Sequence, residues 1–353
     1  MRKILLSLLS FVLLSCEKDA DNTHLVTFEL EEIHQFDVGE NNFIVQFEYD
    51  KENVLWVGTF DGGILKVDQG TVTRYTTENG SLGDDHINDI FIDHHNKVWI
   101  ATNKGVSVFD GESWFNYDMN NVPLFQEYVS EVAVNQSDQV LIGNGVAGNG
   151  GLLLYQEGKW QNFTPENSLL PSNIINEIEI DSKGDFWIGT SMYQGNGGIL
   201  KISQGIIEKV YDSDQGLLYN AVDNLEIDDS TIWLGYEVFY LDEVEYPDGG
   251  IQQINQEGIM KASWFPADTK AVSNRVNNTK LSSTGELWFT TVHDDCLNCI
   301  NGIGVLNDQK KFDVLSAVNY DVESNIYITY IIEDPQGNIN IAQENKIYKV
   351  IKR

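Results

Sequence analysis

The chain has 353 residues and a formal net charge of −32, from 22 basic and 54 acidic side chains. Such a charge repels phosphate backbones and anionic lipid surfaces, so we expect no nucleic-acid partner. The composition, with 42% hydrophobic residues, 11% aromatic residues and only 6 prolines, excludes a disordered or collagen-like chain. It predicts a folded protein with a substantial core.

The N-terminal segment, MRKILLSLLSFVLLSC, has the features of a secretory signal. Arg2 and Lys3 precede an apolar run that is too short for a membrane-spanning helix, which needs roughly 20 apolar residues. The Leu-Leu-Ser-Cys ending resembles the lipobox of bacterial lipoproteins, in which the cysteine is lipidated and becomes the mature N-terminus. We therefore expect a lipoprotein signal peptide over residues 1–15, a lipidated Cys16 and a tether over residues 16–24.

The acidic stretch after this cysteine, EKDAD, resembles the tag that sends some lipoproteins to the outer face of the outer membrane. The expected location is therefore the outer membrane, with the lipid anchor as the only membrane contact. The cell-surface face and the periplasmic face both stay open.

A strand–turn–strand pattern recurs along the rest of the chain. Its copies are FEYDKENVLWVGT, IFIDHHNKVWIAT, VAVNQSDQVLIGN, IEIDSKGDFWIGT, LEIDDSTIWLGY, KLSSTGELWFTT and IIEDPQGNINIAQ. Aligned on the second strand, they place one position at Trp56, Trp99, Leu141, Trp187, Trp233, Trp288 and Asn340. These spacings of 42 to 55 residues suit propeller blades and exceed the roughly 20 to 30 residues of strand-rich solenoid repeats.

The copies before the last continue with a third strand and a fourth, as in GVSVFD and SWFNYD. The last copy stops after its third strand, and the missing outer strand occurs as EEIHQFDV, residues 31–38, just before the first inner strand. We therefore predict an all-β fold over residues 25–353. It is a seven-bladed β-propeller with four-stranded blades, closed by the N-terminal strand, which completes the last blade. We expect a monomer.

The repeat consensus, with Ile, an acidic pair, Gly-Asn and Leu-Trp-Ile-Gly-Thr, resembles the two-component regulator propeller repeat. IIEDPQGNINIAQ and IEIDSKGDFWIGT match it best, and the resemblance covers residues 25–353. In that family such propellers form periplasmic sensor regions of hybrid histidine kinases. The chain ends at Arg353 without kinase modules, so the resemblance implies recognition and not phosphotransfer.

The loops between the second and third strands are short in blades one and two and longer in blades three to six. They share one rim of the ring, where binding residues on a rigid scaffold are expected. Aromatic rings beside carboxylates suit stacking on sugars and hydrogen bonds from hydroxyl groups. The predicted ligand-binding residues on this rim are Tyr193, Tyr236, Phe239, Tyr240, Asp242, Glu243, Tyr246, His293, Asp294 and Asp295. For Phe239 and Tyr240, packing against the blade edge is an equal alternative.

The motif HDDCLNC in blade six contains Cys296 and Cys299. Outside the cytoplasm two cysteines in one loop favour a disulfide. Zinc binding and free thiols stay open, although structural zinc sites use four protein ligands.

The inner strands carry polar residues at equivalent positions, which we expect to line the channel: Gln46, Asp89, Glu131, Glu177, Asn224, Asn278 and Thr329. Such a ring holds either ordered water, which we favour, or a divalent cation, calcium or magnesium. We expect no other cofactor.

The favoured function is a membrane-anchored recognition module that binds a glycan or an outer-membrane protein partner through the loops of blades three to six. One alternative is a metal-dependent lyase resembling the streptogramin lyase-type propellers, with His86 and His293 as the histidines on the loop-bearing face. Another is a structural subunit of an outer-membrane complex. His94 and His95 fall in the opposite turn, and no Gly-x-Ser-x-Gly elbow occurs, so we expect a binding protein rather than an enzyme.

Overall fold

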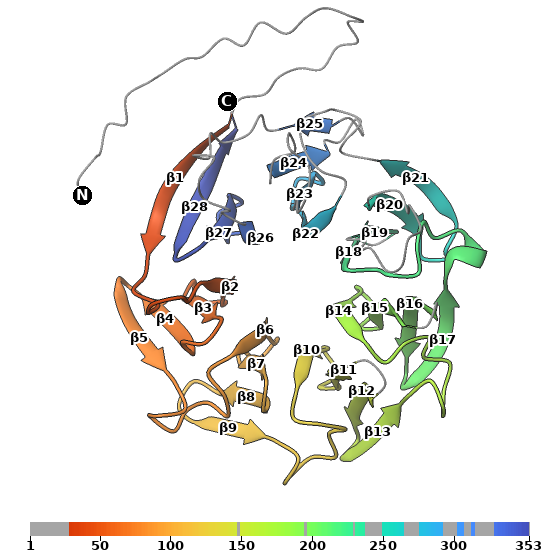
Figure 1. The fold of residues 1–353 in the computed structure, drawn as a ribbon, viewed down its shortest axis with the longest axis horizontal. Helices are drawn as coiled ribbons and strands as arrows, with labels where there is room; N and C mark the ends of the chain where they lie inside the picture. The colour runs from red at the N-terminus through yellow and green to blue at the C-terminus, as the bar shows by residue number, and fades with distance from the viewer. Residues whose placement is uncertain are drawn as a thin grey trace, which may run out of the picture.

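Strands dominate the computed structural model, which describes residues 28–146, 149–193, 196–228, 230–236, 249–264, 275–291, 302–306, 312–314 and 328–352. In these ranges the strands form seven antiparallel four-stranded sheets, arranged as blades around a central axis (Figure 1). No helix in this part of the chain is long and apolar enough to cross a bilayer. The predicted seven-bladed β-propeller is confirmed.

The blades follow one another along the chain. Blade one consists of β2 (Ile44–Tyr49), β3 (Leu55–Thr59), β4 (Ile64–Asp68) and β5 (Thr71–Tyr75). Blade two consists of β6 (Ile87–Ile92), β7 (Val98–Thr102), β8 (Gly105–Phe109) and β9 (Trp114–Tyr117). Blade three consists of β10 (Val129–Val134), β11 (Val140–Val146), β12 (Asn149–Gln156) and β13 (Lys159–Phe163). Blade four consists of β14 (Ile175–Ile180), β15 (Phe186–Tyr193), β16 (Asn196–Ser203) and β17 (Ile206–Tyr211), and the 3-10 helix η1 (Ser213–Gln215) follows it. Blade five consists of β18 (Asn224–Ile227), β19 (Thr231–Tyr236), β20 (Gly250–Asn255) and β21 (Met260–Trp264). Blade six consists of β22 (Val276–Leu281), β23 (Leu287–Thr291), β24 (Gly302–Leu306) and β25 (Phe312–Val314).

The seventh blade joins the two ends of the described chain. Its order is β1 (Phe28–Gln35), β28 (Lys346–Lys352), β27 (Ile339–Gln343) and β26 (Ile328–Glu333), and β1 and β28 lie side by side in Figure 1. The pairing runs from Phe28 opposite Lys352 to Gln35 opposite Lys346. The predicted closure is therefore confirmed, although the strand begins at Phe28 rather than at residue 31. It covers an edge that would otherwise be open to pairing with other chains.

A side-chain bridge explains the acidic residue and the tryptophan of the repeat. In blade two, Oδ1 of Asp93 accepts the backbone N–H groups of His95 and Lys97 at 2.8 and 2.9 Å, and Oδ2 accepts the Nε1–H of Trp99 at 2.9 Å. Asp50 with Trp56 and Asp181 with Trp187 repeat this arrangement at 3.2 and 3.1 Å. One carboxylate thus fixes the tight turn and satisfies the buried indole.

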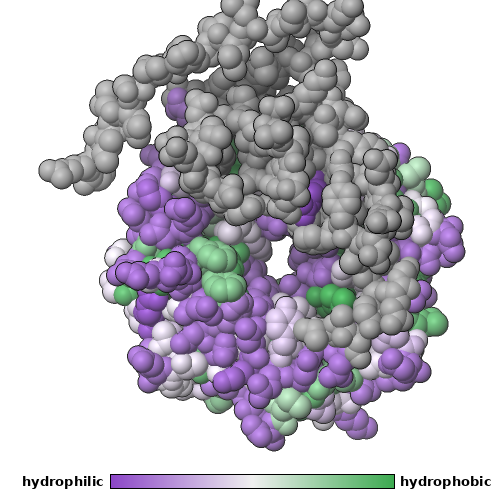
Figure 2. Space-filling view, in the orientation of Figure 1, coloured by the Kyte–Doolittle hydropathy of each residue, from purple (hydrophilic) through white to green (hydrophobic). Residues whose placement is uncertain are grey.

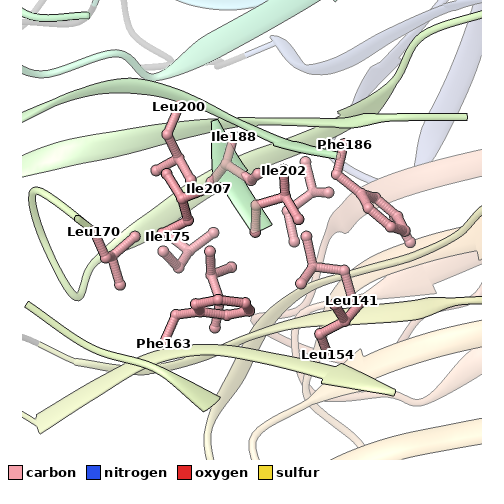
Figure 3. Packing of buried hydrophobic residues seen from close by; sticks show 13 residues of the cluster. Leu141, Leu154, Phe163, Leu170, Ile175, Phe186, Ile188, Leu200, Ile202 and Ile207 are labelled. Atoms are coloured by element: carbon pink, nitrogen blue, oxygen red, sulfur yellow. The ribbon is translucent and has the colours of Figure 1, made fainter. Parts of the chain in front are cut away.

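Apolar side chains fill the wedges between neighbouring blades. Figure 3 shows one such cluster, in which Leu141, Leu154 and Phe163 of blade three meet Phe186 and Ile188 of blade four. Small residues make this approach feasible. A Cβ on Gly58 would lie 2.7 Å from Ile87 Cγ2, and one on Gly143 would lie 2.8 Å from Ile175 Cγ2. The glycine two residues after the tryptophan position therefore receives a side chain of the next inner strand.

Candidate functional site: the central channel

The inner strands of all seven blades surround a polar channel. It contains two adjoining cavities of about 370 and 360 Å³, lined by residues of β2, β6, β10, β14, β18, β22 and β26. Figure 2 shows the central opening, with hydrophilic residues along the described part of its edge. Because alternate residues of a strand face the same side, each inner strand can present to the channel two side chains that are two positions apart in the sequence.

The first layer of the channel wall, here called the first ring, contains mainly carboxylates and amides. Each member of this ring pairs with the residue of the second strand that lies two positions after the tryptophan position. The members are Gln46, Asp89, Glu131, Glu177, Asn224, Asn278 and Tyr330. Six of these seven were predicted. Thr329 lines the channel as predicted, but the residue at the ring position of blade seven is its neighbour Tyr330, which pairs with Ala342.

A second layer, the second ring, was not predicted. Its positions pair with the tryptophan positions, and its polar members are Glu48, Glu179, Glu226 and Lys280. In the other blades, Phe91, Ala133 and Ile332 occupy this layer. The signal was available in the sequence, since these residues follow the first ring by two positions and point to the same face.

Hydrogen bonds between blades hold one side of the first ring. Gln46 donates through Nε2 to Asp89 Oδ1 and to the Tyr330 hydroxyl, both at 2.9 Å. The backbone N–H of Ile90 donates to Gln46 Oε1 at 2.9 Å, and that of Val132 donates to Asp89 Oδ2 at 3.0 Å. Side chains of blades one and two therefore clamp the inner strand of the following blade.

On the other side of the first ring, fewer side-chain oxygen atoms accept hydrogen bonds. Among the described residues, no hydrogen-bond donor reaches the carboxylate of Glu131 or Glu177, although their strands β10 and β14 are in contact. Both side chains retain part of their exposure to the channel. Oδ1 of Asn278 is buried and likewise accepts no hydrogen bond in the described part of the chain. These oxygen atoms could accept hydrogen bonds or coordinate a cation.

Burial, and at several positions also the charge of neighbouring carboxylates, raises the pKa values of the channel carboxyl groups. Burial raises the pKa of Glu48 to about 7 and that of Asp89 to about 6. Burial and then the charge of Glu226 raise the pKa of Glu179 to about 8. The pKa values of Glu131 and Glu177 lie well above the usual range, through burial and then through the charges of neighbouring carboxylates. The channel therefore holds protons near neutral pH.

Lys280 is the cation of the second ring. Its Nζ lies 3.3 Å from Glu226 Oε1, and the side-chain exposures are 31% and 11%. The negative charge of Glu226 raises the pKa of Lys280, and Glu179 and Glu48 add to this effect. In return, Lys280 opposes the burial that raises the pKa of Glu226. One ammonium group thus faces three carboxylates of its own layer.

The rim differs between blades as the loop lengths predicted. In blade three the strand pairing continues to Val146 opposite Asn149, and in blade four it continues to Tyr193 opposite Asn196. In blade two the corresponding pairing ends at Thr102 opposite Gly105. The hairpins of blades three and four therefore extend farther on the rim that bears the loops between second and third strands.

The predicted ligand-binding residues are only partly described. Tyr236 is fully buried, its hydroxyl donates to Gln252 Oε1 at 2.6 Å, and its ring packs edge-on against Tyr219. This placement gives Tyr236 a packing role, with no face open to a ligand. Tyr193 lies at the end of β15. The remaining predicted positions lie outside the described residues: Cys16, Phe239, Tyr240, Asp242, Glu243, Tyr246, His293, Asp294, Asp295, Cys296 and Cys299.

The described histidines lie away from the channel wall. His86, on the rim, has Nδ1 3.1 Å from Asp61 Oδ1, and its ring lies 4.3 Å from the ring of Phe60. His94 and His95 are in the turn between β6 and β7, at the opposite face. His34 is in β1, the outermost strand of blade seven.

Two segments of the chain match a known repeat, and most of its length is similar in sequence to part of a histidine kinase. Residues 81–104 and 169–192 match the two-component regulator propeller repeat. Histidine kinase P4 from Formosa agariphila is 22% identical over 319 residues, which cover 81% of this chain and 22% of that protein. The chain thus spans well under half the length of this relative.

Two solved structures show the same architecture. The extracellular domain of BT4673 from B. thetaiotaomicron, described as a one-component system, matches with a TM-score of 0.62 at 18% identity, covering 90% of this chain and 40% of that one. Virginiamycin B lyase from Staphylococcus aureus, in a catalytically inactive histidine-to-alanine form with quinupristin, matches with a TM-score of 0.67 at 15% identity, covering 92% and 99%. These similarities establish the fold alone. The chain is a seven-bladed β-propeller in which two segments, residues 81–104 and 169–192, match the two-component regulator propeller repeat.

Proposed function

We propose that this protein is an exported, lipid-anchored recognition module that binds a glycan or a protein partner at the rim of blades three to six. The observation that carries the proposal is the asymmetry of the rim, where the hairpins of blades three and four extend beyond that of blade two. A wall beside a channel mouth gives a ligand a concave surface to contact. The repeats, which also suit sensor proteins, support a recognition role.

The lyase alternative is favoured by one observation, the near full-length similarity to virginiamycin B lyase. Fold similarity at this identity does not carry an activity with it, because one fold hosts many functions. A lyase reading would rest on His293, which lies outside the described residues, and on His86, whose ring is engaged with Asp61 and Phe60. We therefore favour binding over catalysis.

Shortening the loops of the rim should weaken binding. The purified full chain is applied to a glycan array and used to capture proteins from outer-membrane extracts. In one variant, residues 145–150 and 191–197 are replaced by tight turns copied from residues 103–105 of blade two. In a second, the segment 239–246 is shortened. We expect at least tenfold weaker binding in each variant. Val72→Ser, an exposed apolar position on the outer strand β5, is the control and should bind normally. Unchanged binding in both loop variants would refute the site.

The same proposal includes a divalent cation, calcium or magnesium, at the first ring. Carboxylate and amide oxygens are the ligands that these hard cations prefer. Glu131 and Glu177 offer carboxylates without described donors, and Asn278 offers a buried oxygen that accepts no hydrogen bond from the described residues. A cation there would offset charges that burial otherwise penalises.

Calcium should stabilise the full chain against thermal unfolding. A ligand present at 100 times its dissociation constant adds about 2.7 kcal/mol to the free energy of unfolding, so millimolar calcium should raise the melting temperature by several degrees. The double variant Glu131→Gln/Glu177→Gln should melt higher than the wild type without calcium at pH 8 and respond little to it. Glu112→Gln, an exposed control, should respond like the wild type. An equal calcium response in the double variant would place the cation elsewhere.

A further inference from the structure

Two histidines and an aspartate converge on the face opposite the extended hairpins. His94 and His95 belong to the turn between β6 and β7, and Asp138 belongs to the equivalent turn between β10 and β11. One ligand atom from each residue lies within 4.8 Å of the other two. In the sequence Asp138 lies more than 40 positions after the two adjacent histidines, and the side-by-side packing of blades two and three brings the three residues together.

The distances between the ligand atoms suit a metal ion. His95 Nε2 lies 3.0 Å and His94 Nε2 lies 3.5 Å from Asp138 Oδ1. Zinc binds nitrogen and oxygen ligands at about 2.0 to 2.2 Å, so neighbouring ligands of a tetrahedral site lie about 3.3 Å apart. The observed separations fall on both sides of this value. A metal ion could therefore enter between the three atoms after small side-chain rotations.

The backbone around these residues is firmly held. The N–H of His95 donates to Asp93 Oδ1 at 2.8 Å, and Lys51 Nζ donates to the carbonyl oxygen of His94 at 2.5 Å. In blade three, the N–H of Asp138 donates to the carbonyl oxygen of Asn135 at 3.0 Å. Because the turns are fixed, the backbone at these three positions need not rearrange for the side chains to bind an ion.

The second nitrogen of His94 is free to carry the ring proton. Nδ1 of this residue is buried and has no hydrogen-bond partner in the described part of the chain. Because no described donor makes a hydrogen bond to Nδ1, the neutral ring can hold its proton at Nδ1. The lone pair of Nε2 is then available to a metal. His94 also borders a shallow cavity of about 380 Å³ at this face.

We propose that His94, His95 and Asp138 form a binding site for a divalent transition-metal ion, with Zn²⁺ as the leading candidate. Imidazole ligands favour zinc, copper and nickel, whereas calcium and magnesium prefer oxygen ligands. Three protein ligands leave at least one coordination position for water or for a side chain of a bound molecule. The side-chain exposures of 27%, 53% and 68% keep that position accessible. The site is thus separate from the channel carboxylates in place and in chemistry.

Calorimetric titration with zinc chloride tests the site on the full chain. All variants carry Cys296→Ser and Cys299→Ser, so that those thiols cannot bind the metal. We expect one zinc site whose affinity falls at least tenfold in His94→Ala and in His95→Ala, and clearly in Asp138→Asn. His86→Ala is the matched control, because it removes an imidazole that also lies beside one aspartate, and its affinity should equal that of the parent.

A spectroscopic readout separates coordination from a general effect on the fold. Paramagnetic resonance of the chain loaded with one equivalent of Cu²⁺ should show two nitrogen ligands in the parent and one in each single histidine variant. Circular dichroism and the urea midpoint identify variants that have lost their structure. Unchanged zinc affinity in the folded double variant His94→Ala/His95→Ala would overturn the proposal. So would a copper spectrum without nitrogen ligands in the parent.

Discussion

Trp187→Ala should cost about 3 to 5 kcal/mol of unfolding free energy, because it removes a fully buried aromatic side chain from the wedge between blades four and five. The indole ring stacks on Tyr211 at a centroid distance of 6.5 Å, and Lys201 Nζ lies 5.4 Å from its centre. Its Nε1–H also satisfies Asp181 Oδ2 at 3.1 Å. The alanine variant therefore loses packing and leaves a buried carboxylate oxygen with fewer donors.

Two matched variants make this result interpretable. Trp187→Leu copies blade three, where Leu141 is fully buried at the same position, so its cost should be clearly smaller. Trp160→Ala removes a part-buried tryptophan from the outer strand β13, which packs on Tyr155, and should cost about 1 kcal/mol. Urea unfolding at constant pH measures all three. A Trp187→Ala midpoint equal to that of Trp160→Ala would mean that the wedge does not depend on this ring.

The repeat pattern in the sequence was sufficient to predict the architecture. The recurring strand–turn–strand copies and the spacing of the tryptophan position specify blades, and the unmatched strand at the N-terminus specifies closure. The boundary error at the first strand, Phe28 rather than residue 31, reflects polar residues such as Glu29 in an outermost strand with one solvated face. Alternating burial is weak there, so the sequence gives little indication of where pairing starts.

The site was predicted less completely, for two physical reasons. The inner strand of blade seven has a bulge between Ile328 and Tyr330, as five other inner strands do, so that both Thr329 and Tyr330 line the channel, and alternation alone does not show which of the two pairs with Ala342. Contacts between blades depend on how neighbouring sheets pack, which spacing along one strand does not reveal. For this reason the partnership of Lys280 with Glu226 and the approach of Asp138 to His94 became visible only in three dimensions.

Lys280→Met should destabilise the protein in a pH-dependent way. Removing one partner of a buried ion pair costs about 3 to 5 kcal/mol, and we expect the lower end at pH 8 because channel water reaches 31% of the lysine side chain. At pH 5 the loss should be much smaller. The pKa values of Glu48 and Glu179, about 7 and about 8, mean that these carboxyl groups are protonated at pH 5 and no longer need the ammonium group.

The stability of the wild type should also fall as the pH rises. For a carboxyl group with a raised pKa in the folded state, its stabilising contribution is fully present below the unfolded pKa and is lost as the pH rises through the folded pKa. These groups should therefore make the wild type less stable as the pH rises from about 5 to about 8, and Lys280→Met should steepen that decline. Urea midpoints at both pH values measure it.

Two further variants test whether the buried charge is the cause. Lys346→Met removes a lysine of similar exposure, 30%, whose partner Glu32 is 43% exposed on the closing strands, so its cost should stay within about 1 kcal/mol at both pH values. Adding Glu226→Gln to Lys280→Met should recover part of the loss at pH 8, because one uncompensated carboxylate disappears. If Lys280→Met were equally destabilising at pH 5 and pH 8, packing of its aliphatic stem would be the source. The charge of the second ring would then not govern the stability of the channel.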